Sequence, residues 1–322
     1  RVLFRSSLAK INKQAGQNMS GFFEKLCLAA GNGQVTRDEM MNRHTTFRVG
    51  GPASYFVSPD GDEALKKVLL LCREEQMPYY ILGNGSNLLV SDKGYGGVMI
   101  LMGEGFAQIR EDVPGELAAG AGALLSRIAR EAQEHSLTGF EFAAGIPGTL
   151  GGAVVMNAGA YDGEMKNVLK TVSVMDKNGR ILELSANELE LGYRRSCIQE
   201  KEYIVLSAVI SLKQGDKEAI QTKMAELAGK RRDKQPLEYP SAGSTFKRPA
   251  GYFAGKLIED AGLRGYREGG AQVSEKHCGF VINSGGATAE DIRLLCRSVQ
   301  KKVKETSGVD LETEVRMIGW DE

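Results

Sequence analysis

Two glycine-rich stretches decide the fold: residues 82–87, which read Leu-Gly-Asn-Gly-Ser-Asn, and residues 145–152, which read Gly-Ile-Pro-Gly-Thr-Leu-Gly-Gly. The first contains a glycine loop, residues 83–87, that directly follows an apolar run at 79–82 predicting a short strand. A third cluster, Gly120-Ala121-Gly122, precedes a helical pattern. Glycine at this density indicates positive φ angles or a backbone that lies close to a ligand.

These loops carry no Lys or Arg, so backbone dipoles would hold any ligand. Successive backbone N–H groups form a concave anion site that suits a pyrophosphate, and Ser86 and Asn87 add hydrogen-bond donors. One such cluster is usually a tight turn, whereas three in one half of the chain favour a dinucleotide-binding site. The chain lacks Gly-x-Gly-x-x-Gly and Gly-x-x-x-x-Gly-Lys-Ser/Thr, which disfavours a Rossmann domain and a nucleoside triphosphatase.

Composition and charge exclude other classes of function. The chain has 322 residues, about two domains' worth, and its 41 Lys and Arg balance 41 Asp and Glu. This neutrality argues against non-specific nucleic-acid binding and against a polybasic membrane surface. The five cysteines form no Cys-x-x-Cys pair, which argues against a disulfide framework or a zinc site and fits the cytoplasm. The three scattered histidines are interpreted as structural or surface residues, and no metal site is expected.

No apolar run reaches the roughly 18 residues that a membrane-spanning helix needs. The uncharged stretch Phe142–Tyr161 contains five glycines and a proline, and we interpret it as loop backbone rather than a helix. Residues 1–7 begin without Met and show no signal-peptide pattern, so we interpret them as a non-native remnant.

The periodicity of apolar residues predicts an α+β protein with a division near Gln214–Asp216. Residues 8–40 read as one or two polar lead-in helices, and Gly50-Gly51-Pro52 as a turn between two strand-like pieces within 47–57. Further helices are expected at 62–76, 124–134, 216–232, 253–261 and 288–306, the last opened by a Thr288/Asp291 capping box and closed by Gly308. Further strands are expected at 171–175 and 180–184, joined by an Asn178-Gly179 hairpin turn, and at 203–212, 280–283 and 309–318.

The two glycine-rich stretches together resemble the flavin-binding loops of the vanillyl-alcohol-oxidase/para-cresol-methylhydroxylase (PCMH) type. Four further motifs narrow the resemblance to the family of UDP-N-acetylenolpyruvoylglucosamine reductases. They are His44-Thr-Thr-Phe-Arg-Val-Gly-Gly51, Gly192-Tyr-Arg-Arg-Ser196, Ala242-Gly-Ser-Thr-Phe-Lys-Arg-Pro249 and Leu311-Glu-Thr-Glu-Val-Arg-Met-Ile-Gly319. Their order and spacing match the family from about Met40 to Gly319.

The resemblance implies a PCMH-type FAD-binding domain over residues 41–214, after a lead-in at 1–40, and a smaller α+β substrate-binding domain over 215–322. FAD would be bound without a covalent link, since neither 82–90 nor 143–161 contains a His or Cys. The cofactor-binding positions that match the family are Leu82, Gly83, Asn84, Gly85, Ser86, Asn87, Leu88, Gly120, Gly145, Ile146, Pro147, Gly148, Gly151, Gly152, Asn157, Gly159 and Ala160.

The implied reaction has two steps and belongs to the synthesis of peptidoglycan precursors. NADPH reduces FAD and leaves, and the enolpyruvyl ether of UDP-N-acetylglucosamine takes its place. Flavin N5 then gives a hydride to the vinyl carbon and a protein acid protonates the neighbouring carbon, which yields UDP-N-acetylmuramate. This role implies a cytoplasmic oxidoreductase linked to cell-wall biogenesis, cell shape, the cell cycle and cell division, with no membrane insertion and no obligate protein partner.

Three residues match the family's catalytic positions. Hydride addition builds negative charge on the substrate carboxylate, so a fixed cation must face it, and Arg194 matches that role. Ser244 matches the proton donor. Glu314 matches an essential glutamate that either orients the enolate or relays the proton. The adjacent Arg195 is expected to point elsewhere, and Glu312 is interpreted as structural.

The substrate diphosphate needs cations, and Arg231 and Lys234 match the family's Arg-x-x-Lys pattern for it. Arg248 matches a position at which an Asn or Arg contacts the substrate in relatives. Dipole stabilisation of a helix end is a competing explanation for the neighbouring basic residues Lys230 and Arg232. Only residues 213–215 separate the expected strand at 203–212 from the next helix, so the chain resembles the short, type II form of the family. The longer form carries a substrate-covering Tyr in an insertion at this point.

Two other functions remain open at this stage. An FAD-dependent oxidase of the same superfamily would have no use for the Arg194, Ser244 and Glu314 motifs. A flavin- or nucleotide-sugar-binding module without catalysis would keep the loops and lose the reaction.

Overall fold

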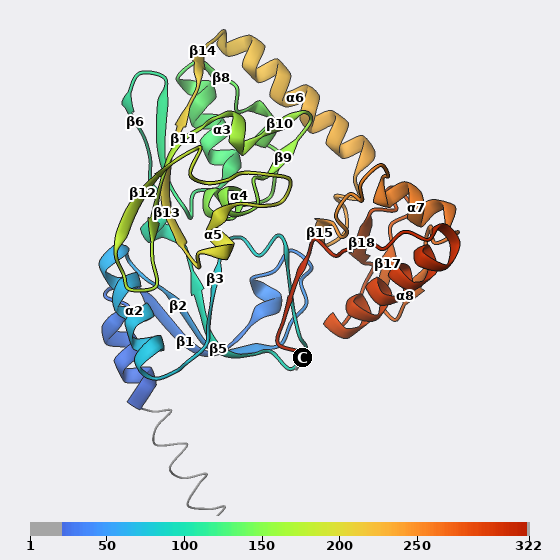
Figure 1. Cartoon of the computed structure of the whole chain (residues 1–322), viewed down its shortest axis with the longest axis horizontal. Coiled ribbons are helices and arrows are strands. Elements are labelled where there is room, and N and C mark those ends of the chain that lie inside the picture. Colours follow the sequence, from blue (N-terminus) through green and yellow to red (C-terminus); the bar gives the residue numbers. More distant parts are fainter. Residues whose placement is uncertain (1–20, 321–322) are drawn as a thin grey trace, which may run out of the picture.

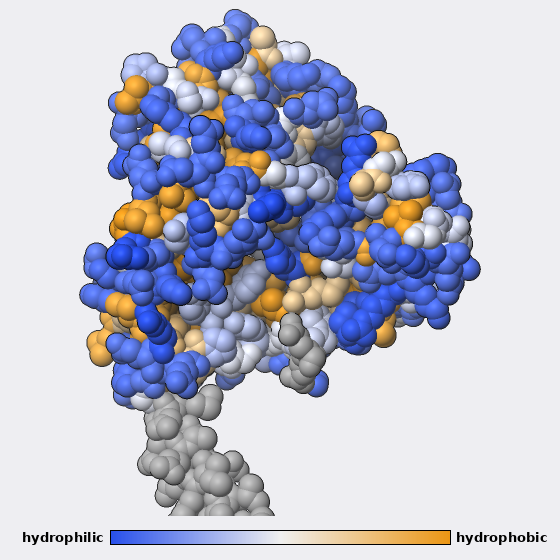
Figure 2. Space-filling view, viewed as in Figure 1, coloured by the Kyte–Doolittle hydropathy of each residue, from blue (hydrophilic) through white to orange (hydrophobic). Residues whose placement is uncertain are grey.

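The computed structural model describes residues 21–320, so the interpretations of residues 1–7 and of 8–20 lie outside the described residues. Within the described part, no helix is long and apolar enough to cross a membrane. The face shown in Figure 2 is mainly hydrophilic, with apolar residues scattered in small groups.

The first unit is a four-stranded sheet in the order β1-β2-β5-β3. Its strands are β1 (Gln34–Met40), β2 (Pro52–Ser58), β5 (Tyr95–Leu101) and β3 (Tyr79–Leu82). The expected helix α2 (Asp62–Glu74) is confirmed; it connects β2 to β3 and buries its Leu65, Val68 and Leu69. Residues 21–29 are helical, but the helical prediction for 34–40 is wrong. Those residues form β1 because backbone pairing with β2 outweighs their polar composition at a sheet edge.

The second unit is a five-stranded antiparallel sheet in the order β12-β11-β13-β7-β6. Its strands are β12 (Ile181–Ser185), β11 (Leu169–Met175), β13 (Ile204–Ser211), β7 (Glu116–Gly120) and β6 (Ile109–Val113). The predicted hairpin is confirmed, with Gly179 at φ +75° in the turn. Asp176 accepts hydrogen bonds from the backbone N–H groups of Asn178 and Arg180, and these bonds lower its pKa to about 2.

Helices α3 (Leu125–Glu134), α4 (Leu150–Val155) and α5 (Cys197–Glu200) lie beside this second sheet (Figure 1). The interpretation of 142–161 as loop backbone is wrong for α4. Two glycines open this helix, but Leu150, Ala153 and Val154 bury their side chains in the core that both sheets share. That burial outweighs the helix-breaking tendency of glycine.

Shorter elements complete this half of the chain. They are strands β4 (Leu88–Val90), β8 (Leu137–Thr138), β9 (Gly159–Ala160), β10 (Gly163–Glu164) and β14 (Lys213–Gln214), and single 3-10 turns at Met41–Arg43, Glu104–Phe106, Glu141–Ala143 and Met165–Asn167.

The third unit has its own core and is joined to the second by the long helix α6 (Lys217–Lys234), as Figure 1 shows. Its sheet has the order β15-β18-β17-β16, and α7 (Ala254–Asp260) and α8 (Ala289–Ser307) pack in the same core. The strands are β15 (Ser241–Ser244), β18 (Phe280–Asn283), β17 (Ala271–Val273) and β16 (Arg267–Glu268). The predicted capping box of Thr288 and Asp291 is confirmed, as is left-handed Gly308 after α8.

The C-terminal segment, residues 309–320, returns from the third unit to the first (Figure 1). The expected strand over 309–318 is wrong for most of its length, because only β19 (Arg316–Ile318) pairs, in parallel, with β4. Residues 309–315 cross between the two units, where a single bridge joins Thr313 to Phe246. The predicted division near Gln214–Asp216 coincides with the start of α6, and the domain boundaries themselves stay predictions.

Asp92, in the turn after β4, ties the first unit to the third. Its carboxylate accepts hydrogen bonds from the backbone N–H of Ala289 (2.8 Å) and of Glu290 (2.9 Å), the first two residues of α8. The first N–H groups of a helix have no acceptor within the helix, and the helix dipole favours a negative charge beside them.

We expect D92A to lower the free energy of unfolding by about 0.5–2 kcal/mol, because two N–H donors lose their acceptor. The measurement is urea unfolding followed by the fluorescence of Trp320, whose Nε1 donates to Glu290 beside this contact. D112A is the matched control, since Asp112 is 62% exposed and lies 3.5 Å from Arg110, and it should change stability by less than about 0.5 kcal/mol. Equal losses in the two variants would contradict the account.

Candidate active site

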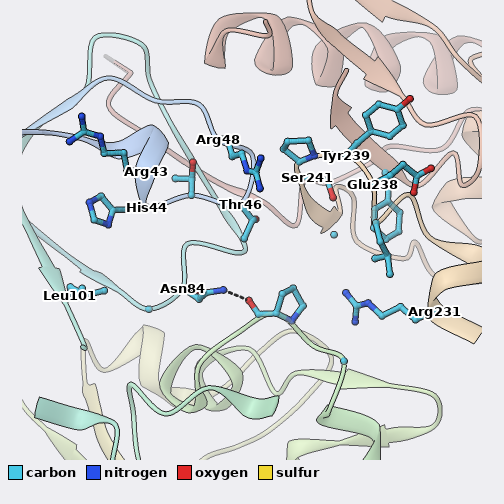
Figure 3. A pocket seen from close by; sticks show the side chains of 18 residues that line it. Arg43, His44, Thr46, Arg48, Asn84, Leu101, Arg231, Glu238, Tyr239 and Ser241 are labelled. Carbon is cyan, nitrogen blue, oxygen red and sulfur yellow. Dashed lines mark hydrogen bonds between the residues drawn. The ribbon is translucent and has the colours of Figure 1, made fainter. Parts of the chain in front are cut away.

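A cavity of about 710 Å³ lies where the three units meet (Figure 3). One wall is made by the two glycine-rich loops through Gly83, Asn84, Gly145 and Pro147. Residues 43–48 form a second wall, and residues 237–243 with Arg231 of α6 form the third. The glycine loops predicted to bind a cofactor therefore face one shared space.

The glycines of these loops fall into two groups. A Cβ on Gly85, which has φ +59°, would lie 1.9 Å from the carbonyl oxygen of His44, and a Cβ on Gly120 would lie 2.1 Å from that of Phe106. These two glycines permit the chain to pack on itself. By contrast, a Cβ on Gly148 would meet nothing closer than 3.7 Å, and one on Gly152 would meet nothing within 4 Å. The backbone at Gly148 and Gly152 is thus open to a ligand, as a pyrophosphate site requires.

Two of the asparagines predicted to bind the cofactor direct their side-chain amides elsewhere. Asn157 is buried at φ +44° and donates to Glu164 (3.0 Å) and to the carbonyl of Gly192 (3.2 Å). Asn87 donates to the carbonyl of Glu314 (3.0 Å). Asn84, in contrast, lines the cavity and donates to the carbonyl of Pro147 (2.8 Å), which joins the two loops (Figure 3).

The cations of this cavity come from outside the glycine loops. Arg231 is among the predicted site residues, whereas sequence reasoning missed Arg43 and Arg48 of the second wall. Arg48, which adopts a left-handed φ of +57°, belongs to the 44–51 motif, but Arg43 precedes that motif and carries no such signal. This segment packs on the first glycine loop, where the N–H of Thr46 donates to the carbonyl of Gly85 (3.2 Å).

Arg231 reaches the cavity from the opposite side (Figure 3). A Cβ on Gly145 would lie 3.2 Å from its Cδ, so its side chain packs directly on the second glycine-rich loop. Burial lowers the pKa of its guanidinium, and no carboxylate pairs with it among residues 21–320. A partly buried cation without a counter-ion favours binding of an anion. Lys234, at the end of the same helix, is exposed.

Arg194 and Glu314 do not line this cavity; they form an ion pair with 2.6 Å between Nε and Oε1. Their side chains are 21% and 10% exposed, respectively. Arg194 holds a left-handed φ of +54°, a conformation that costs a non-glycine residue energy and that clusters at functional sites. Burial raises the pKa of Glu314, against the opposing effects of Arg194 and Lys247. The pair contributes to a second cavity, of about 410 Å³.

Ser244 directly precedes Thr245, whose backbone carbonyl binds the backbone N–H of Glu314. It ends β15 opposite Phe280, after Gly243 at φ +75°. The next carbonyl, that of Thr245, accepts a hydrogen bond from the N–H of Glu314 (2.8 Å), and the buried Thr245 hydroxyl accepts one from the N–H of Val281 (2.9 Å). The structure thus brings the segments of Arg194, Ser244 and Glu314 together from three separate parts of the chain.

The remaining predicted residues lie around this junction. The backbone N–H of Arg248 donates to the Tyr193 hydroxyl (3.0 Å), and the Arg248 guanidinium lies 3.9 Å from the centre of the Phe253 ring. Arg195 points away, as predicted, and donates to Glu200 (3.0 Å). Glu312 pairs with Lys247 at the surface.

Comparisons with known proteins agree with this arrangement. Residues 53–185 match the model of the FAD binding domain, and residues 235–318 match that of the C-terminal domain of UDP-N-acetylenolpyruvoylglucosamine reductase. The chain is 54% identical over 89% of its length to the reductase of that name from Caldanaerobacter subterraneus, of which it covers 94%. The corresponding enzyme of Lachnoclostridium phytofermentans is 55% identical, with 89% of this chain and 93% of the relative covered.

A solved structure agrees with the fold class. The crystal structure of UDP-N-acetylenolpyruvylglucosamine reductase from Thermus caldophilus superimposes with a TM-score of 0.76 at 38% identity, covering 88% of this chain and 99% of the other. The predicted fold class, an FAD-binding domain followed by a smaller α+β domain, is confirmed. The chain belongs to the UDP-N-acetylenolpyruvoylglucosamine reductase family.

Proposed function

We propose that the protein reduces UDP-N-acetylenolpyruvoylglucosamine to UDP-N-acetylmuramate with FAD and NADPH, and that Arg194, Ser244 and Glu314 carry the reaction. The observation that carries this proposal is the Arg194–Glu314 ion pair, held next to the Ser244 segment and beside the glycine loops. The three catalytic residues have no use in an oxidase, so the oxidase alternative is not favoured. The match to the reductase family supports the same choice.

FAD, when bound, supplies the hydride and takes electrons from NADPH. Asn84 with Arg43 and Arg48 in the cavity, and the open backbone at Gly148 and Gly152 in the second glycine-rich loop, support binding of a pyrophosphate-bearing cofactor. Neither loop offers a His or Cys for covalent attachment. The remaining cofactor positions predicted from the family stay predictions.

Arg194 stabilises the negative charge that develops on the substrate carboxylate. Its Nε donates to Glu314 and its Cζ lies 5.2 Å from the centre of the Tyr193 ring, but within residues 21–320 its terminal Nη groups have no hydrogen-bond partner. Those groups are free to donate to a carboxylate, and a preorganised donor there is worth several kcal/mol in the transition state. Glu314 as a carboxylate fixes the guanidinium in place, so we assign it the orienting role rather than the relay.

Ser244 protonates the substrate carbon next to the carboxylate. A serine hydroxyl is a weak acid, so position matters more than its acidity. The pairing of β15 with β18, which has a register shift between Ser241 and Ser244 and Gly243 at φ +75°, fixes that position. Arg231 and Lys234 would hold the diphosphate, and Arg248 would contact the substrate. Arg231 is the strongest candidate because it is a partly buried cation with no carboxylate partner among residues 21–320. We further propose a cytoplasmic role in building the cell wall, and hence in cell shape, the cell cycle and cell division.

We expect S244A to leave reduction of the flavin by NADPH within about twofold of wild type. Its reoxidation by the enolpyruvyl substrate should fall by at least about 100-fold, because the proton donor acts only in that step. The measurement is anaerobic stopped-flow absorbance of each half-reaction. S298A is the control, since Ser298 lies on α8 and its hydroxyl donates to Glu268 of β16, away from the predicted site residues. Equal slowing of both half-reactions by S244A would remove Ser244 from the proton-donor role.

The pH dependence of flavin reoxidation tests the role of Glu314. Burial raises the pKa of Glu314 above its ordinary value of 4.5, so protonation sets in at a higher pH than for an exposed glutamate. If the carboxylate orients Arg194, the reoxidation rate of the wild type falls as the pH drops through that raised pKa. E314Q should be slow at every pH and should not show this fall in rate. A rate that instead rises as the pH drops would assign Glu314 to the proton relay.

A further inference from the structure

Asn87, at the end of the first glycine loop, directs its side-chain amide nitrogen toward other residues of the protein. Its amide nitrogen donates to the carbonyl of Glu314 (3.0 Å) and to the sulfur of Met156 (3.2 Å). Its backbone carbonyl accepts a hydrogen bond from the N–H of Arg316 (3.0 Å). One residue of the cofactor loop thus binds the main chain on both sides of Val315.

These bonds begin the parallel ladder between the first unit and the C-terminal segment. Leu88, which follows Asn87, lies opposite Arg316 in the pairing of β4 with β19. Residues 309–315 form no ladder of their own. Besides the bridge at Thr313, the carbonyl of Leu311 accepts a hydrogen bond from Gln300 (2.8 Å) and that of Glu312 accepts one from the N–H of Lys247 (2.8 Å), and all these contacts come from the third unit. Asn87 therefore fixes the last residues before the ladder, where Glu314 stands.

The backbone of Glu314 is held from two sides. Its N–H donates to the carbonyl of Thr245, next to Ser244, and its carbonyl accepts from Asn87. The carboxylate of Glu314 in turn holds Arg194 at 2.6 Å. A shift of the Glu314 backbone would therefore move the guanidinium relative to both the glycine loop and Ser244.

We infer that Asn87 is a positioning residue for the reductive chemistry: through the Glu314 carbonyl it sets the Arg194–Glu314 pair against the cofactor loop. This inference rests on the proposed function of Glu314 and adds to it. It also gives the two asparagines of the loop different roles: Asn84 lines the cofactor cavity, and Asn87 positions the Arg194–Glu314 pair. A displacement of about 1 Å in such a site can cost about 100-fold in rate.

The test uses FAD-loaded N87L, which keeps the side-chain shape and removes the donor, with N84L as the matched variant. We expect N87L to slow reoxidation of the flavin by the enolpyruvyl substrate 10- to 100-fold, and reduction by NADPH less than threefold. Its FAD dissociation constant, measured by dilution of the holoenzyme, should change less than threefold. N84L should raise that constant about tenfold or more, because it breaks the bond between the two loops.

A second readout does not depend on substrate. Hydrogen exchange of the peptide spanning 311–318 should be faster in FAD-loaded N87L than in wild type or in N84L. N87D, which has the same size but cannot donate, should match N87L in both readouts, and it serves if N87L fails to fold. Unchanged exchange at 311–318, or an FAD constant raised as much as in N84L, would overturn the inference. The proposed function fails separately, if the reduced wild-type enzyme is not reoxidised by the substrate.

Discussion

The structure depends on one constraint: the C-terminal segment must cross back from the third unit to the first. Its ladder of β19 with β4 begins directly after the first glycine loop. Glu314 lies just before that ladder, with its N–H bonded to one unit and its carbonyl to the other. The ion pair with Arg194 then brings in the connection between β12 and β13 of the second sheet. The catalytic groups are therefore held by contacts between units rather than within any one of them.

The cofactor cavity is likewise built by several units together. The glycine loops supply open backbone but no charge, and the cations come from the 43–48 segment and from α6. A loop without bulky side chains permits close approach of the cofactor pyrophosphate, and the cations of the 43–48 segment lie on another wall of the same cavity. The partly buried guanidinium of Arg231, which has no carboxylate partner among residues 21–320, is left for the substrate diphosphate.

Much of the fold could be predicted from sequence patterns that extend over a few residues. Helix α2, the hairpin at Asn178-Gly179 and the capping box at Thr288 each carry a signal within a few residues, and all three formed as expected. Strand β1 and helix α4 were missed because distant partners stabilise them against their own composition.

The residues of the candidate site also fall into those that local motifs identify and those that depend on distant contacts. Motifs identified Arg194, Ser244 and Glu314, but no motif shows that Asn87 bonds to a residue 227 positions away. Arg48 lies in a family motif and Arg43 does not, but their place at the cavity follows in both cases from how the 43–48 segment packs on Gly85.

The most direct test of the account is the visible spectrum of the FAD-loaded protein under anaerobic conditions, first with NADPH and then with the enolpyruvyl nucleotide sugar. The account predicts that NADPH bleaches the flavin and that one equivalent of the sugar restores the spectrum and yields one equivalent of UDP-N-acetylmuramate. A flavin that bleaches but recovers only when oxygen is admitted would contradict it.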